Sequence, residues 1–225
     1  MSDAKQEVRE RVWRLLEREQ AARFPGARGR IPNFKGAEAA AARLAELPEW
    51  QAAQVVKANP DSPQLSVRRR ALRDGKLLYM AVPRLADEKP FVRVESDPTI
   101  RRAMREGTPV DVDELEPIDL VVCGTVAANR KGVRVGKGGG YSDLEFGLLV
   151  EAGLVGDATT IATTVHPLQL LDEELPETEH DFRVDRIVTP DEVVRPGRRR
   201  RPPGILWDHL ADEKVEAIPV LRRRR

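Results

Sequence analysis

The chain has 225 residues, of which 40% are hydrophobic, and this is enough to build the core of one large α/β domain. Its 38 basic and 37 acidic residues nearly cancel, so the charge of the whole chain gives no bias towards nucleic acid or a membrane. A single cysteine excludes an internal disulfide, and with a charged N-terminus and no long apolar run we expect a cytoplasmic protein that does not contact a membrane.

The first half of the chain alternates predicted helices and strands. An N-terminal helix capped by Ser2 or Asp3 carries one apolar stripe, and a loop rich in proline and glycine follows at 24–36. We expect helices at 37–47, 65–73 and 98–106, and strands at 54–58, 76–82 and 91–94. Such alternation is typical of a parallel sheet covered by helices.

The second half contains the glycine-rich stretch Arg134-Val-Gly-Lys-Gly-Gly-Gly-Tyr-Ser-Asp143. The apolar run at 118–123 is predicted to be a buried strand that leads into this loop, and a helix is predicted at 142–153. Glycines let a phosphate approach bare backbone N–H groups, the helix start adds its positive dipole, and Arg134 and Lys137 supply charge. The stretch therefore predicts a phosphate site, although four glycines alone are equally typical of a flexible turn.

Beyond the loop we expect strands at 159–165 and 187–188, with Asp181 and Asp185 beside the second of them. By position alone these two are turn and strand-edge acids. We interpret 1–195 as the α/β domain and 196–225 as a Pro/Arg-rich extension, packed on it or trailing from it, with a short helix at 208–216. Arginine runs at 198–201 and 222–225 are usually solvated, but such runs can also bind nucleic acid through its phosphates.

The pattern Arg-x-Gly-x-Gly-x-Gly-Tyr-x-Asp resembles the signature of the 5-formyltetrahydrofolate cyclo-ligase family, also called methenyltetrahydrofolate synthetases. From Arg30-Ile-Pro-Asn-Phe-Lys-Gly36 to the segment around Trp207, the chain looks most similar to the methenyltetrahydrofolate synthetase domain-containing branch. The resemblance implies a three-layer α/β/α fold with a central mostly parallel sheet, of the Rossmann-like NagB/RpiA/CoA-transferase type. It also implies ATP-dependent cyclisation of 5-formyltetrahydrofolate to 5,10-methenyltetrahydrofolate, with MgATP and a reduced folate as small-molecule substrates.

The resemblance further implies roles for particular residues. Arg134 and Lys137 would be catalytic, and the first helix would reach the nucleotide phosphates with a Lys/Arg pair one turn apart, which could otherwise be solvated charge. The implied ATP-binding residues are Lys5, Arg9, Arg134, Gly136, Lys137, Gly138, Gly139, Gly140, Tyr141 and Asp143. Mg²⁺ would be placed by Asp143 and Asp185, with Asp181 as a structural acid. Tyr141 would stack on the pterin of a folate or on a base, or equally fill the core.

Two features of the catalytic pattern are missing. Where the enzymes have Pro-Gly-x-Ala-Phe-Asp, this chain has Cys123-Gly-Thr-Val-Ala-Ala-Asn129, and in place of Glu-x-x-Thr it has Asn59-Pro-Asp-Ser-Pro-Gln-Leu65. The competing hypothesis is a nucleotide- or RNA-binding protein without folate turnover. We favour the enzyme, because the chain is nearly neutral and its few aromatic residues form no base-stacking pattern. On that hypothesis no residue beyond the strand at 187–188 takes part in the chemistry. No sequence feature bears on the oligomeric state.

Overall fold

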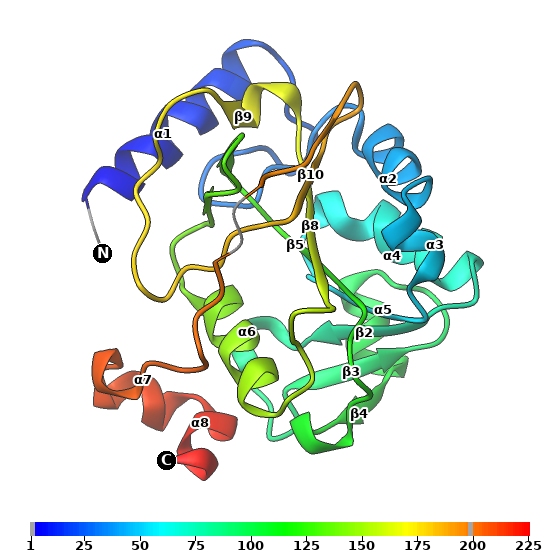
Figure 1. The fold of residues 1–225 in the computed structure, drawn as a ribbon, viewed down its shortest axis with the longest axis vertical. Coiled ribbons are helices and arrows are strands. Elements are labelled where there is room, and N and C mark those ends of the chain that lie inside the picture. Colours follow the sequence, from blue (N-terminus) through cyan, green and yellow to red (C-terminus); the bar gives the residue numbers. More distant parts are fainter. Residues whose placement is uncertain (1–2, 198–199) are drawn as a thin grey trace.

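The computed structural model describes residues 3–197 and 200–225, and within them an eight-stranded sheet forms the middle layer (Figure 1). The strand order is β11-β10-β8-β5-β1-β2-β3-β4. The strands are β1 (Val55–Ala58), β2 (Leu77–Ala81), β3 (Phe91–Val94), β4 (Thr108–Val110), β5 (Leu120–Cys123), β8 (Thr160–Thr164), β10 (Arg186–Val188) and β11 (Val193–Val194). The inner neighbours β10, β8, β5, β1 and β2 run parallel, and only the edges are antiparallel. The predicted mostly parallel sheet is confirmed.

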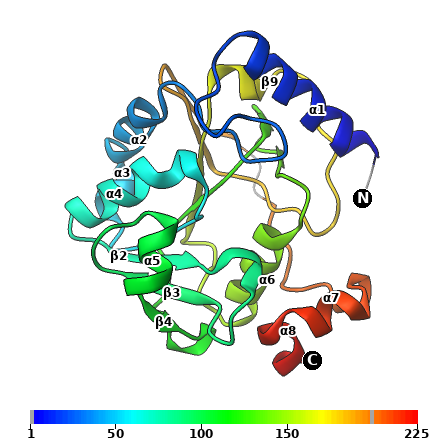
Figure 2. The same cartoon turned by 180° about the vertical axis from the view of Figure 1, so that it is seen from behind.

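Helices cover both faces of this sheet, because successive side chains of a strand point to opposite sides. On β5, Leu120 and Val122 belong to one core and Val121 and Cys123 to the other. Figures 1 and 2 show the helices on either side. The first core is covered by α2 (Ala37–Ala45), α3 (Pro48–Ala52), α4 (Leu65–Arg73) and α5 (Ile100–Glu106), and the second by α6 (Tyr141–Glu151), α7 (Asp212–Ala217) and α8 (Pro219–Arg224). The fold is therefore the predicted three-layer α/β/α arrangement.

A smaller sheet carries the glycine-rich loop. β6 (Ala127–Asn129) pairs antiparallel with β7 (Arg134–Val135) and parallel with β9 (Leu170–Leu171). The helix α1 (Asp3–Arg18) packs its buried side chains into the same cluster as Val126 and Val135. We predicted that the strand at 118–123 leads straight into the loop, but β6 and β7 intervene. Strands of two or three residues are too short to leave a periodic signal in the sequence.

Two further elements were predicted only in part. The strand at 91–94 is present as β3, but it runs antiparallel to β2, because residues 82–90 are too few for the crossover that a parallel pair needs. The helix predicted at 208–216 begins later, as α7, after a 3₁₀ turn at Trp207–His209, and a second helix, α8, follows it. Proline at the first turn of a helix is favourable, and Pro219 begins α8 in the same way as Pro48 begins α3.

The C-terminal extension packs on the α/β domain. Val220 and Leu221 of α8 are fully buried in the core that α6 also enters. The arginines at 222–225, predicted to be a solvated arm, form ion pairs with Glu88, Asp111, Asp113 and Asp212. Residues 198 and 199 of the other arginine run lie outside the described residues. No helix within 3–197 and 200–225 is long and apolar enough to span a bilayer.

We expect the contact between α6 and the extension to be sensitive to a single methyl group at Gly147. A Cβ there would lie 2.9 Å from Cγ1 of Ile205 and 3.1 Å from the backbone of Gly204. Gly147→Ala should therefore cost about 1–3 kcal/mol of unfolding free energy and loosen the extension towards proteases. Gly156→Ala is the control, because a Cβ at Gly156 meets nothing within 4 Å. Equal stability and equal digestion of the two variants in urea and protease titrations would contradict this docking.

Candidate functional site

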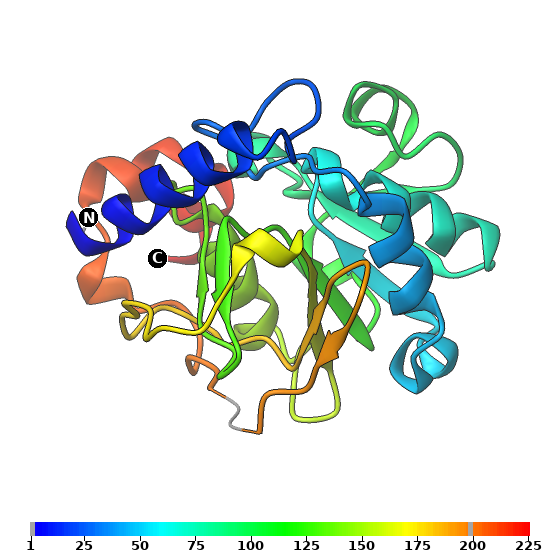
Figure 3. The ribbon, with the colours of Figure 1, turned by 90° about the horizontal axis from the view of Figure 1, so that it is seen from above.

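A cavity of about 980 Å³ lies where β1, β2 and β5 end. Asn59, Arg84 and Gly124, which follow these three strands, line it. Ligands of open α/β sheets bind outside the carboxyl ends of the strands, so the position is that of a ligand site. The other walls are α1, the glycine-rich loop with the start of α6, and residues 178–181 and 204–214. Figure 3 shows α1 and the C-terminal helices on the same side of the molecule.

The glycine-rich loop crosses the cavity and opens α6. Gly138 (φ +110°) and Gly140 (φ +70°) have left-handed backbone conformations that side chains disfavour, and Gly140 is the residue that caps the helix. The unpaired N–H groups and the positive dipole end of α6 therefore face the cavity. An anion bound here would be stabilised by both, as the sequence predicted.

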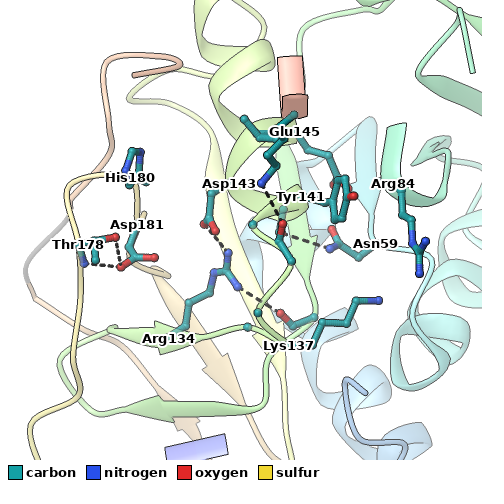
Figure 4. Close-up of a pocket in the computed structure, with 18 of the residues that line it drawn as sticks. Asn59, Arg84, Arg134, Lys137, Tyr141, Asp143, Glu145, Thr178, His180 and Asp181 are labelled. Atoms are coloured by element: carbon teal, nitrogen blue, oxygen red, sulfur yellow. Dashed lines mark hydrogen bonds and ion pairs between the residues drawn. The ribbon is translucent and has the colours of Figure 1, made fainter. Parts of the chain in front are cut away.

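Arg134 lies in the middle of the site, beneath the loop (Figure 4). One of its terminal nitrogens donates to Oδ1 of Asp143 at 2.8 Å, and its guanidinium carbon lies 4.2 Å from the centroid of the Phe182 ring. Burial lowers the pKa of Arg134, but the nearby carboxylate of Asp143 raises it. The net result is a pKa above the ordinary value of arginine. Its Nε is buried without a hydrogen-bond partner within the described residues. The guanidinium thus remains charged, and one of its donors is left unsatisfied by the part of the chain that the structure describes.

The two basic residues of α1 also line the cavity. Nε of Arg9 donates to the carbonyl of Gly136 at 2.7 Å, which fixes the glycine-rich loop to α1. Nζ of Lys5 lies 2.5 Å from Oδ2 of Asp181. The side chain of Lys5 is 13% exposed, so the pair is more than a solvated surface contact. The structure therefore brings the predicted Lys/Arg pair to the cavity, where Arg9 contacts the glycine-rich loop and Lys5 contacts Asp181.

Lys137, at the tip of the loop, is half exposed and lies 3.6 Å from Asp61. Asp61 comes from the stretch that replaces Glu-x-x-Thr, and its Oδ2 would lie 2.5 Å from a Cβ on Gly124. The chain lacks the acid that the enzymes carry after the strand corresponding to β5. The fold brings the carboxylate of Asp61, from the turn after β1, to Gly124 at the start of the altered stretch, and only the tertiary structure shows this.

A buried ion pair supports the start of α6 from below. Lys57 of β1 contacts Glu145 of α6, and both side chains are at most 6% exposed. Lys57 also donates to Oδ1 of Asn59 at 2.8 Å, and the amide of Asn59 donates to Oγ of Ser142 at 3.3 Å. These contacts join the end of β1 to the first turn of α6. The sequence shows only that Lys57 interrupts an otherwise apolar strand. Its partner Glu145 lies far away in the chain, so these contacts could not be predicted.

The predicted acids separate in the structure. Asp143 and Asp181 line the cavity, where burial raises the pKa of Asp143 and the charge of Asp181 raises it further against the opposing effect of Arg134. Asp185 does not line the cavity. Its Oδ2 accepts from the backbone of Ile161 at 2.9 Å and pairs with Arg201 at 3.0 Å. Of these two acids it is therefore Asp181 that lies at the cavity, whereas Asp185, just before β10, is bonded to β8 and Arg201.

Tyr141 and several residues that the sequence analysis missed complete the walls. Tyr141 lines the cavity and also packs against the core, so its position is compatible with both alternatives for its ring. In Figure 4, Thr178, His180 and Asp181 lie to one side of Arg134, and Asn59, Tyr141 and Arg84 to the other. His180 contacts His209 of the extension through ring nitrogens 3.3 Å apart. Within the described residues no cluster of three metal-ligating side chains occurs.

Comparisons with known proteins show the family and the fold. The model of the 5-formyltetrahydrofolate cyclo-ligase family matches residues 1–190. The curated proteins named "Methenyltetrahydrofolate synthase domain-containing protein" of mouse and human are 39% and 38% identical, each over 99% of this chain, and the chain spans 63% and 61% of their lengths. The structure is similar in fold to the 5,10-methenyltetrahydrofolate synthetase of Aquifex aeolicus, with a TM-score of 0.58, 22% identity and coverage of 87% of this chain and 94% of that one. The chain belongs to the 5-formyltetrahydrofolate cyclo-ligase family.

Proposed function

We propose that this protein converts 5-formyltetrahydrofolate to 5,10-methenyltetrahydrofolate with consumption of ATP. One observation supports the proposal most strongly. Cationic side chains from separate segments line the cavity together with the glycine-rich loop that begins α6: Lys5, Arg9, Arg134 and Lys137. Phosphates are the ligands that such a combination of helix start, bare amides and cations stabilises best.

In the proposed reaction the formyl oxygen on N5 attacks the γ-phosphate of ATP, and ADP leaves. N10 then closes on the formyl carbon, and loss of phosphate gives the methenyl product. Chemistry of this kind needs positioning and neutralisation of charge, and no covalent nucleophile. Arg134, Lys137 and the loop amides would hold the β- and γ-phosphates, with Lys5 and Arg9 reaching them from α1. Tyr141 would present its ring to the pterin or the adenine.

The residues present also suit Mg²⁺. This ion takes one or two protein carboxylates, phosphate oxygens and water, so a cluster of three protein ligands is not required. Asp143 and Asp181 would hold it, because both line the cavity. The pKa of Asp143 is raised mainly by burial and less by the charge of Asp181, and a divalent cation would offset both effects. Bound there, the ion would neutralise charge on the phosphates. Asp185 has no part in this site.

A non-catalytic role in nucleotide or RNA binding is the second candidate. The missing Pro-Gly-x-Ala-Phe-Asp and Glu-x-x-Thr features favour it. The position of Asp61 beside Gly124 weighs against it, since a carboxylate is present at the cavity despite the altered motif. The ion pairs of the arginines at 222–225 weigh against RNA in particular, because these side chains already have acidic partners.

We expect MgATP to stabilise the protein against unfolding. At a hundred times its Kd, a ligand that binds only the folded state adds about 2.7 kcal/mol to the unfolding free energy. A thermal melt with and without saturating MgATP measures this, with magnesium alone as the control. Addition of 5-formyltetrahydrofolate to the same sample should then produce the near-ultraviolet absorbance of methenyltetrahydrofolate. An unchanged melting temperature would refute the phosphate site, whereas stabilisation without the absorbance would favour the non-catalytic alternative.

A further inference from the structure

The segment from Gly204 to Lys214 forms one wall of the cavity, although it lies beyond residue 190, where the match to the family model ends. It contributes Ile205, Leu206, Leu210 and Lys214 to the lining. We predicted that no residue beyond the strand at 187–188 takes part in the chemistry. That stays a prediction, but residues beyond this strand do line the cavity. The similarity to the mouse relative covers 99% of the chain and so includes this segment.

The wall is held in place by specific contacts with α6. The backbone N–H of Ile205 donates to Oε1 of Glu151 at 2.9 Å, and the indole N–H of Trp207 donates to the same oxygen at 3.2 Å. Beyond the wall, Val215 and Ile218 are almost fully buried in the core shared with α6. These hydrogen bonds and buried side chains fix the position of the segment relative to α6 and the glycine-rich loop.

Lys214 is the charged residue that this wall directs at the loop. Its Nζ donates to the carbonyl of Gly139 at 3.1 Å and lies 5.4 Å from the centroid of the Tyr141 ring. A Cβ on Gly140 would lie 3.1 Å from the same nitrogen, so the ammonium sits directly over the residue that caps α6. Burial lowers the pKa of Lys214, while Asp143 opposes the shift.

We propose that Lys214 is an additional phosphate-binding residue, reaching the nucleotide site from the C-terminal segment. The proposal rests on the proposed ATP binding and adds a cation to that site. An anion seated on the amides at the start of α6 lies beside this ammonium, and a phosphate oxygen is a stronger acceptor for it than the neutral carbonyl of Gly139. Lys214 would then approach the phosphates from the side opposite to Lys5 and Arg9, which come from α1.

The test compares Lys214→Met with Lys214→Arg and with a control, Lys131→Met, which removes an exposed lysine paired with Glu174. Calorimetric titration with MgATP, and with inorganic tripolyphosphate, gives the affinities. We expect Lys214→Met to weaken both ligands at least about tenfold, and Lys214→Arg and the control to stay within about threefold of the parent. The dependence of log Kd on log salt should also become shallower for Lys214→Met, which a merely structural lysine would not cause.

The outcomes separate the two proposals. If the unaltered protein binds MgATP and Lys214→Met binds it equally well, the role of Lys214 is refuted and the proposed function stands. If Lys214→Arg loses as much as Lys214→Met, the shape of the side chain matters and not its charge, which also refutes the phosphate contact. If the unaltered protein binds neither MgATP nor tripolyphosphate, both proposals fall together.

Discussion

Lys57→Met is expected to lower the unfolding free energy by about 3–5 kcal/mol, because it leaves Glu145 buried without a cation. The side chains of Lys57 and Glu145 are 3% and 6% exposed, so water cannot replace the lost partner. Against a total stability of about 5–15 kcal/mol for a domain, this is among the largest losses that one substitution causes. Urea unfolding of the two proteins measures it.

The double variant Lys57→Met/Glu145→Leu separates loss of the pair from loss of volume. Replacing both charges by apolar groups of similar size is often neutral, so the double variant should recover most of the stability that the single variant loses. Lys131→Met, which breaks an exposed pair, should change little. If Lys57→Met loses less than about 1 kcal/mol, or if the double variant does not recover, the ion pair does not contribute to the unfolding free energy in this way.

The same pair matters for function because of where it acts. Lys57 and Asn59 lie at the end of β1, and their contacts with Glu145 and Ser142 set the position of the first turn of α6. The glycine-rich loop ends where that turn begins. The double variant is therefore expected to regain stability without regaining full stabilisation by MgATP, since its apolar side chains cannot reproduce the polar link to Asn59.

The regular elements were predictable because their signals are local. The helix at 65–73 and the strand at 91–94 were predicted with the bounds that α4 and β3 have, since period, glycine and proline mark them in the sequence. The direction of β3 could not be predicted, because a strand's direction in a sheet depends on the strand with which it pairs. The short strands β6, β7 and β9 and the second C-terminal helix also escaped prediction, because tertiary packing against α1 and α6 stabilises them.

The candidate site divides in the same way. The glycine-rich loop and its neighbours Arg134 and Asp143 form one contiguous stretch, and the structure keeps them together. Asp61 beside Gly124, the buried Lys57 and the wall around Lys214 are contacts between distant segments, for which a single sequence holds no pairing information. For the same reason the sequence could not show that Asp181, and not Asp185, lies at the cavity. The two acids are four residues apart, and only the path of the chain decides which one reaches it.

Arg134→Gln should weaken MgATP binding by about 10- to 150-fold, which corresponds to the 1.5–3 kcal/mol of one charge-assisted hydrogen bond. It should also cost about 3 kcal/mol of unfolding free energy, the lower end of the range for a broken buried pair, because the Asp143 side chain is still 22% exposed. Titration calorimetry and urea unfolding measure the two effects on the same sample. The affinity for 5-formyltetrahydrofolate should fall much less than that for MgATP.

Arg134→Gln/Asp143→Asn decides whether Arg134 acts on the ligand or only through its partner. The double variant removes both charges of the pair, so the desolvated carboxylate that destabilises the single variant is gone and stability should largely return. The affinity for MgATP should not return, because the cation that would meet the phosphates is still absent and the amide introduced by Asp143→Asn would be a weaker ligand for magnesium than a carboxylate. Recovery of binding together with stability would mean that Arg134 merely neutralises Asp143. The phosphate contacts would then have to come from the other cations, Lys5, Arg9, Lys137 and Lys214, and from the loop amides.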